Sequence, residues 1–146
     1  MAAETESAMA ASPVGKTKDA GWEIGAVRSF PVSVDEAWRF LSSPAGAAVW
    51  LGQGAAIPKQ KGDCYLTDDG TIGELRGYRV GDRIRVTMRA PHSDHETTVQ
   101  CTVSGNSEKT QIRFHQERML DAREREIQRA HWISVLNRLA DVFKTS

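Results

Sequence analysis

Three consecutive segments between residues 83 and 119 alternate apolar and polar side chains with a period of two, and this pattern constrains the fold most. Their apolar members are Ile84, Val86, Met88, Val99, Cys101, Val103, Ile112 and Phe114. A period of two is typical of strands that bury one face and expose the other. Because the segments follow one another through short connections, they predict an antiparallel meander with one face in water.

Three further strands are predicted ahead of this meander, at residues 22–30, 61–67 and 71–80. The sequence Asp68-Asp69-Gly70 separates the last two and is typical of a tight hairpin turn, where the backbone needs positive φ. Gly73 and Gly77 interrupt the period of the strand at 71–80. We interpret them as bends or bulges in a curved sheet.

Three helices are predicted from their start signals. Ser33 with Glu36 three residues later forms a capping-box pattern, and Pro44 stands where proline favours a first helical position. Asp121 with Glu124 gives a similar start for a helix over residues 121–144, about 36 Å long at the standard rise. Its apolar stripe consists of Trp132, Val135, Leu136, Leu139 and Phe143.

These elements predict an α+β domain over residues 22–146, in which a curved antiparallel sheet of about six strands packs on a long C-terminal helix. Two short helices follow the first strand. Residues 1–21 are rich in Ala, Ser, Thr and charge, so we expect a disordered tail there.

Charge and composition argue against several functions. The 19 basic and 19 acidic residues give zero net charge, which argues against a general nucleic-acid binder. No apolar run approaches the length that spans a bilayer, and the N-terminus lacks the pattern of a secretory signal. Cys64 and Cys101 form no CxxC motif. We therefore expect a cytoplasmic protein with reduced thiols.

Four motifs together resemble the START/Bet-v-like helix-grip (SRPBCC) superfamily, in the branch of the activators of the heat-shock chaperone 90 ATPase. The first motif is R-x-F at 28–30 with Trp38, Pro44 and Trp50, and the second is KGDCY at 61–65. The third is DG-x-x-G-x-L at 69–75 with RIRVT at 83–87, and the fourth is His131-Trp132 with Leu136 and Leu139. Together they extend over residues 22–143. Leu51, Asp63 and His131 depart from the branch pattern, which has Trp, Gly and Gly there.

The resemblance implies a sheet that grips the C-terminal helix and leaves a cavity between them. Trp50 and Leu51 would line the entrance, although a core position for Trp50 stays equally open; Trp38 is expected in the core. The inward set would line the cavity: Leu66, Leu75, Val86, Met88, Val99, Cys101, Ile112 and Phe114, with Trp132 from the helix. Arg28, Arg125 and Gln128 are candidate polar anchors for a ligand.

Other chemistry has weaker signals. His131 is a candidate acid or base if it faces the cavity, and otherwise a half-exposed helix histidine. The sequence His92-Ser93-Asp94-His95 offers metal-ligand types, but a solvated loop between strands explains it better, so no metal or cofactor is expected. The arginines at 76, 79, 83, 85 and 89 fit either an anion-binding patch or a solubilising outer face, and their alternation with acids favours the latter.

We therefore expect a small binding protein that holds an apolar or aromatic molecule, lipid-like or polyketide-like, between the sheet and the helix. Two alternatives remain open, and both come from the resemblance. One is an enzyme of natural-product metabolism, of the cyclase, dehydratase or self-resistance type. The other is a co-chaperone-like module with a chaperone partner.

Overall fold

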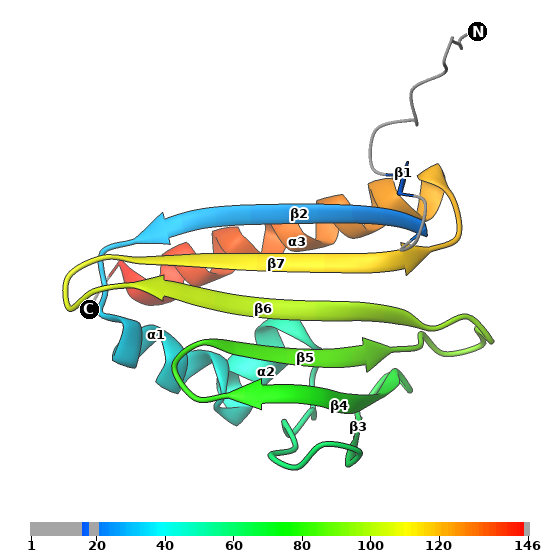
Figure 1. Ribbon diagram of the computed structural model, residues 1–146, viewed down its shortest axis with the longest axis horizontal. Coiled ribbons are helices and arrows are strands. Elements are labelled where there is room, and N and C mark those ends of the chain that lie inside the picture. The colour runs from blue at the N-terminus through cyan, green and yellow to red at the C-terminus, as the bar shows by residue number, and fades with distance from the viewer. Residues whose placement is uncertain (1–15, 18–20, 145–146) are drawn as a thin grey trace, which may run out of the picture.

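The computed structural model describes residues 16–17 and 21–144, and these form one antiparallel sheet with three helices. The elements in chain order are β1 (Lys16–Thr17), β2 (Gly21–Phe30), α1 (Val34–Leu41), α2 (Pro44–Trp50), β3 (Cys64–Leu66), β4 (Ile72–Arg79), β5 (Arg83–Met88), β6 (Thr97–Gly105), β7 (Thr110–Met119) and α3 (Ala122–Phe143) (Figure 1). The α+β prediction and the order of its elements are confirmed.

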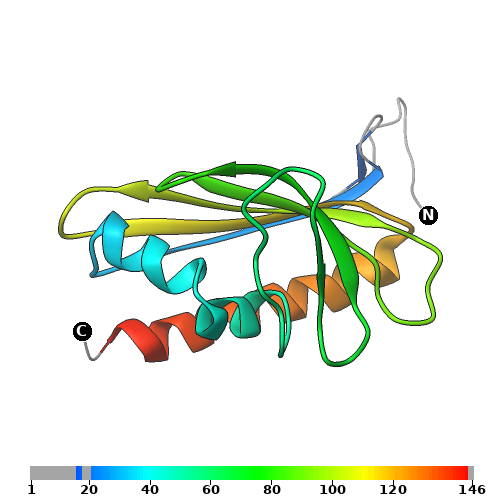
Figure 2. The same cartoon turned by 90° about the horizontal axis from the view of Figure 1, so that it is seen from below.

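The sheet has the strand order β1-β2-β7-β6-β5-β4-β3. Strands β3 to β7 follow one another as hairpins, and β2 returns to pair with β7. All three helices lie on one face of this curved sheet, and no helix of the described residues covers the opposite face (Figure 2). The helix-covered face is therefore the core face, as the alternation in β5 to β7 predicts.

One strand lies inside the segment predicted to be a tail. Lys16 and Thr17 of β1 pair with Trp22 and Gly21 at the start of β2, which raises the strand number to seven. This pairing corrects the predicted tail boundary at residue 21 for these two residues. The rest of that segment, residues 1–15 and 18–20, lies outside the described residues.

The helices begin at the predicted caps. The hydroxyl oxygens of Ser33 and Ser43 accept hydrogen bonds from the amides of Glu36 at 3.0 Å and Gly46 at 3.1 Å, respectively. The carboxylate of Asp121 does the same for the amide of Glu124 at 2.8 Å. Each cap satisfies an amide that has no partner within its helix, so these short polar side chains fix where the helices start.

Gly46 sets the angle between α1 and α2. A Cβ atom at this position would lie 1.8 Å from the carbonyl oxygen of Phe40, so no other residue fits without moving one of the helices. This close approach folds α2 back under the sheet. As a result, Trp50 at the end of α2 points into the interior.

The β3–β4 hairpin depends on a second close approach. Tyr65 lies directly opposite Gly73, and its hydroxyl group donates a hydrogen bond to the carbonyl oxygen of Thr87 at 2.7 Å. Because Gly73 has no side chain, the buried phenol ring can cross over it toward β5. Burial, with the nearby charge of Glu96, raises the pKa of the Tyr65 phenol, which therefore stays protonated and can donate.

Candidate functional site

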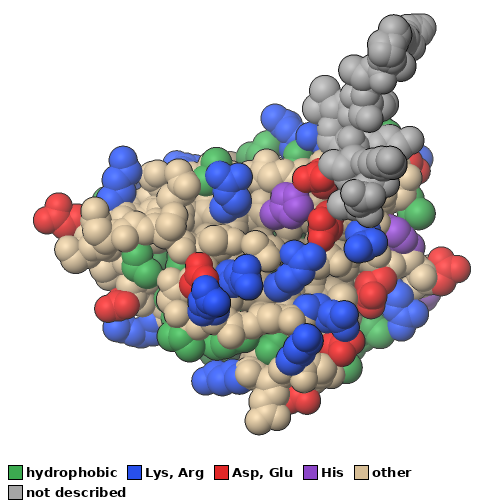
Figure 3. Space-filling view, viewed as in Figure 1, with side chains coloured by type: hydrophobic (Ala, Val, Ile, Leu, Met, Phe, Trp, Pro, Cys, Tyr) green, Lys and Arg blue, Asp and Glu red, His purple; other side chains and the backbone are tan. Residues whose placement is uncertain are grey.

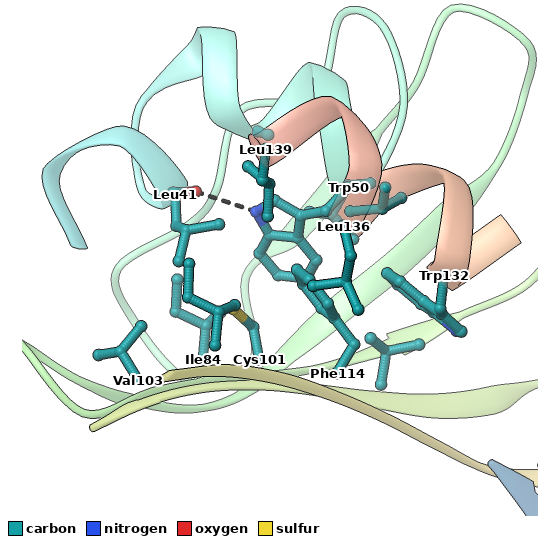
Figure 4. Close-up of a cluster of buried hydrophobic side chains, with 14 of the residues drawn as sticks. Leu41, Trp50, Ile84, Cys101, Val103, Phe114, Trp132, Leu136 and Leu139 are labelled. Carbon is teal, nitrogen blue, oxygen red and sulfur yellow. Dashed lines mark hydrogen bonds between the residues drawn. The ribbon is translucent and has the colours of Figure 1, made fainter. Parts of the chain in front are cut away.

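Three aromatic rings occupy the centre of the space between the sheet and α3. Phe114 from β7 stacks on Trp132 from α3, with ring centroids 4.7 Å apart and planes inclined by 13°. Trp50 from α2 lies on the other side of Phe114 at 5.8 Å. All three side chains are fully buried, and aliphatic side chains such as Leu41, Ile84 and Leu139 surround them (Figure 4).

The indole nitrogen of Trp50 is satisfied by the helix that precedes it. Its Nε1 donates to the carbonyl oxygen of Leu41, the last residue of α1, at 3.0 Å (Figure 4). This bond uses a carbonyl that has no partner in its own helix, because the last four carbonyls of any helix lack intrahelical donors. Trp50 is thus a core residue in this structure and does not lie at an entrance, which corrects one of the two positions predicted for it.

A chain of polar side chains runs through the apolar interior beside the rings. Nε1 of Trp132 donates to Oε1 of Gln116 at 2.9 Å, and Nε2 of Gln116 donates to Oγ1 of Thr97 at 3.0 Å. The Thr97 hydroxyl donates in turn to the carbonyl oxygen of Met88 at 3.2 Å. Gln116 is only 2% exposed. Such a network is stabilising only when each buried polar group has a partner, and here the members bond one another.

Sequence reasoning missed Gln116 and Thr97. Gln116 continues the inward alternation of Ile112 and Phe114 on β7, so its position predicted burial although its residue type did not. A glutamine at an inward strand position is the signal that could have indicated a buried polar contact, because buried polar groups need hydrogen-bond partners. Its partners come from β6 and α3, and local sequence does not reveal them.

His131 faces α2, so it is not placed as an acid or base for a molecule in the interior. Its imidazole packs edge-on against Trp132, with ring centroids 4.6 Å apart, and it hydrogen-bonds the main chain of Trp50. Burial lowers the pKa of His131, the hydrogen bond partly opposes this shift, and the charge of Arg138 adds to it. Arg138 itself donates to the carbonyl oxygen of Val49 at 3.5 Å. Both side chains therefore hold the C-terminal end of α2 against α3, where helices favour such donors.

Most of the predicted ligand-binding residues lie together in the interior. Nine of them are buried, with at most 6% exposure: Trp50, Leu51, Leu75, Val86, Val99, Cys101, Ile112, Phe114 and Trp132. Met88 is partly buried against the same cluster, and Gln128 is half-buried on α3. The side chains that were expected to line an open cavity pack against one another, so in this structure the interior at this level is filled.

Leu66 and Arg28 lie elsewhere. Leu66 is 61% exposed because Tyr65 takes the inward position in β3, so the prediction that Leu66 faces α3 is wrong. Arg28 is also exposed; its Nη1 donates to Oδ1 of Asn137 at 2.9 Å, and its guanidinium lies 5.8 Å from the ring centroid of Phe30. It therefore ties β2 to α3 at the surface and does not reach the interior.

Leu66 contributes to a groove of about 420 Å³ on the outside of the molecule. The groove lies along β3, β4 and the end of β5, and its lining also includes Cys64, Ile72, Glu74, Thr87, Arg89 and Glu96. Its lining combines the exposed side chains of Cys64 and Leu66 with charged groups of both signs. The groove therefore differs from the apolar cavity that was predicted between the sheet and the helix.

The loop with two histidines packs on the start of α3. Nε2 of His95 lies 3.5 Å from Oε1 of Glu124, while His92 is exposed. Within residues 16–17 and 21–144, no three His, Cys, Asp or Glu side chains gather in a group that could hold a metal ion. No helix of the described part is long and apolar enough to cross a membrane.

The sheet, the long helix gripped beneath it and the two short helices after β2 define the helix-grip fold. No protein-family profile and no curated protein matches the sequence. Among solved structures, DynU16, a protein from the dynemicin biosynthetic locus, has a TM-score of 0.72 with 23% identity, over 84% of this chain and 47% of its own. The chain thus spans about half the length of DynU16.

Two further structures have the same fold over most of their length. CalU16 from Micromonospora echinospora has a TM-score of 0.73 at 14% identity, over 88% of this chain and 82% of its own. The Aha1 dimer from Colwellia psychrerythraea has a TM-score of 0.69 at 12% identity, over 84% of this chain and 96% of its own. At these identities the likeness is one of fold, and it agrees with the helix-grip resemblance of the sequence.

Proposed function

We propose that this protein binds an apolar or aromatic small molecule between the sheet and α3, in the place that the Trp50 ring occupies in the present conformation. One observation carries the proposal: the ring that fills the centre of the interior comes from α2, a helix of seven residues. A movement of this one short element would withdraw a whole indole from beside Phe114.

The surroundings of Trp50 fit such a ligand. Ligand pockets are mostly apolar and contain a few placed polar groups. Here Phe114 and Trp132 offer ring faces to a flat molecule, and the nearby Gln116 amide is the polar group that fixes an orientation. The shared fold with DynU16, from a biosynthetic locus, supports a natural-product-like molecule as the ligand.

The side-chain hydrogen bonds that hold α2 to its neighbours are few enough to exchange for a ligand. The indole donates to Leu41, and the donors His131 and Arg138 reach the main chain at Trp50 and Val49. A hydrogen bond of this kind contributes about 0.5–1.5 kcal/mol net, because water replaces it when it opens. A ligand that fills the vacated space regains the apolar contacts that Trp50 gives up.

The test is a titration of the whole chain with a panel of aromatic polyketides and fatty acids, followed by the indole N–H signals of Trp50 and Trp38 in NMR spectra. We expect saturable shifts of the Trp50 signal and none of Trp38, which packs on Tyr78 away from the site. Absence of saturable binding for every compound, or binding that leaves the Trp50 signal in place, contradicts the proposal.

Two variants sharpen this test. Trp50→Ala removes the ring that a ligand must displace, so its affinity for any binding compound should exceed that of the natural chain. Trp38→Ala removes an equally large, buried ring elsewhere and should leave affinity unchanged. If Trp50→Ala fails to fold, Trp50→Phe provides the same comparison with a smaller ring. Equal affinities in all chains place the ligand away from Trp50.

A second candidate function is interaction with a chaperone. Two observations favour it: the protein shares its fold with the Aha1 structure, and its sequence motifs resemble those of the HSP90 activators. Mixing the protein with purified chaperone 90 and measuring its ATPase rate tests this function. An unchanged rate together with no complex in gel filtration contradicts it.

A further inference from the structure

The outer face of the sheet carries two neighbouring rows of side chains that contain no acid. The strand registers define one row as Arg79–Arg83–Thr102–Arg113–Val27 and the next as Gly77–Arg85–Gln100–His115–Gly25, each crossing β4, β5, β6, β7 and β2. Lys and Arg side chains gather over the middle of this face (Figure 3). The registers collect arginines from three strands, β4, β5 and β7, into one area, called here the arginine face. Acids beside the rows pair with some of its basic groups, in agreement with the mixed charge that the sequence favours: Asp82 with Arg79, Glu117 with Arg85 and Glu23 with His115.

Two of its guanidinium groups are available to a partner. Arg85 donates to Glu117 at 2.6 Å and to Gln100 at 3.2 Å, and Arg79 lies 3.4 Å from Asp82, so both are already paired. Arg83 and Arg113 are exposed and form no ion pair with the described residues. Thr102 lies directly between them in the register, so they stand two strand spacings, about 10 Å, apart.

The arrangement is not what stability alone favours. Arg79 and Arg83 are direct cross-strand partners, and like charges in that position destabilise a sheet. The glycines of the second row are not required by packing either. A Cβ atom would have its nearest neighbour at 4.0 Å at Gly25 and at 3.8 Å at Gly77, which are ordinary contacts. Because the two glycines have no side chains, a partner molecule can come close to the backbone at both ends of this row.

We propose that the arginine face is a docking surface for an acidic segment of another protein, with Arg83 and Arg113 as its principal contacts. Guanidinium groups bind carboxylates through two parallel hydrogen bonds, which favours a carboxylate-bearing partner. The two rows contain no Phe, Tyr or Trp on which nucleic-acid bases would stack, and their one imidazole, His115, is paired with Glu23 at 2.8 Å. The chain also has no net positive charge. This inference is independent of the small-molecule site, which lies on the opposite face of the sheet.

The experiment uses the full chain and a fluorescein-labelled peptide of twelve residues in which Asp and Glu alternate with Ser. We expect saturable anisotropy changes at about 20 mM salt that weaken strongly near 0.5 M, because screening shortens the range of exposed charges to a few ångströms. The double variant Arg83→Gln/Arg113→Gln should lower affinity by more than about twofold and up to about thirtyfold, the range that two exposed ion pairs provide.

The matched control is Arg123→Gln/Arg129→Gln, which removes the same charge from exposed positions on α3. It should bind the peptide within about twofold of the natural chain, because α3 lies on the other face of the sheet and its side chains do not contact a peptide on the arginine face. Equal losses in both double variants would mean that net charge alone drives binding and would overturn the proposal. So would the absence of any peptide binding at low salt.

Two further readouts distinguish the partner class and the folding state. A twelve-nucleotide single-stranded RNA should bind more weakly than the peptide; tighter RNA binding that depends on Arg83 and Arg113 assigns the face to nucleic acid and overturns an acidic protein partner. Arg83→Gln removes the repulsion with Arg79, so its urea midpoint should match or exceed that of the natural chain. A lost affinity then reflects the surface and not unfolding.

Discussion

Trp50 and Trp132 show how single residues combine burial with a polar requirement. Each is fully buried, and each indole nitrogen donates to an acceptor, the Leu41 carbonyl for Trp50 and the Gln116 amide for Trp132. An unsatisfied buried donor costs about 1–3 kcal/mol, so these acceptors matter as much as the apolar contacts. For Trp50 the acceptor also fixes which way the ring points.

His131 gives the stability of the protein a defined pH dependence. Burial lowers its pKa below the ordinary value of 6.5, so below that pH the unfolded chain binds the proton more readily than the folded one. The stability that burial of the neutral imidazole contributes is therefore complete above pH 6.5 and is lost as the pH falls through the lowered pKa. Urea unfolding of the natural chain and of His131→Gln at pH 8 and pH 5 measures it.

We expect the free energy of unfolding to fall less between pH 8 and pH 5 in His131→Gln than in the natural chain. His92→Gln is the control, because His92 is exposed on a loop and should leave the natural pH dependence intact. Identical pH dependence in all three chains would show that His131 binds protons equally well in the folded and unfolded states.

Among the elements, the β3–β4 hairpin shows most directly how one residue shapes a larger unit. Its inward ring, Tyr65, needs the space above Gly73 to reach β5. The sequence predicted a bend or bulge at Gly73 and at Gly77, and the register shift between Leu75 and Gly77 places the irregularity at the second glycine. Gly73 has a different role, a close approach of a ring and a backbone, which depends on contacts between strands.

Gly73→Ala should destabilise the protein by about 1–3 kcal/mol, the cost of overpacking a filled site. The added Cβ would lie 1.9 Å from the carbonyl oxygen of Thr87 and 2.5 Å from the Tyr65 ring, so the hairpin must move. Urea unfolding measures the loss. Gly77→Ala is the matched control on the same strand, where the new Cβ would meet only ordinary contacts, and it should be neutral or slightly stabilising. Equal effects at the two positions contradict this assignment.

α2 illustrates how a short element depends on its cap. It has seven residues, and Ser43 provides its N-terminal hydrogen bond. Because α2 carries Trp50 into the interior, its stability and the filling of the core are linked.

Ser43→Ala should cost about 1 kcal/mol in the free energy of unfolding, the usual value of a lost N-cap. Ser43→Asp, which keeps a cap acceptor, should recover most of this loss. Hydrogen exchange at the amides of α2 provides a second measurement: faster exchange there in Ser43→Ala, with unchanged rates in β6, supports a local effect, and a uniform change contradicts it.

The molecule as a whole consists of two layers that bury a single core between them. Cys101 lies in this core, whereas Cys64 lies on the outer edge of the sheet. Burial raises the pKa of the Cys101 thiol, which suppresses the reactive thiolate. The two thiols therefore report separately on the surface and on the opening of the layers.

Iodoacetamide at pH 8 should modify one thiol per folded chain quickly and the second only when urea unfolds the protein. In Cys64→Ser the fast reaction should disappear, which identifies the surface thiol. Mass spectrometry counts the modified sites. Rapid modification of both thiols in the folded natural chain would show that the layers separate without global unfolding.

Local patterns in the sequence were enough for the strands, the caps and the long helix, because periodicity and capping depend on residues a few positions apart. The alternation in β5 to β7 also identified which side chains turn inward, Val99, Cys101 and Phe114 among them. The arrangement of the interior depended on contacts between distant segments: Gly46 against Phe40 directs Trp50 inward, and Gln116 meets Trp132 only when β7 and α3 pack together. Such contacts together decide whether the space between the layers is open or filled. The tertiary structure decides this, because the side chains that fill the space come from parts of the chain that are far apart in sequence.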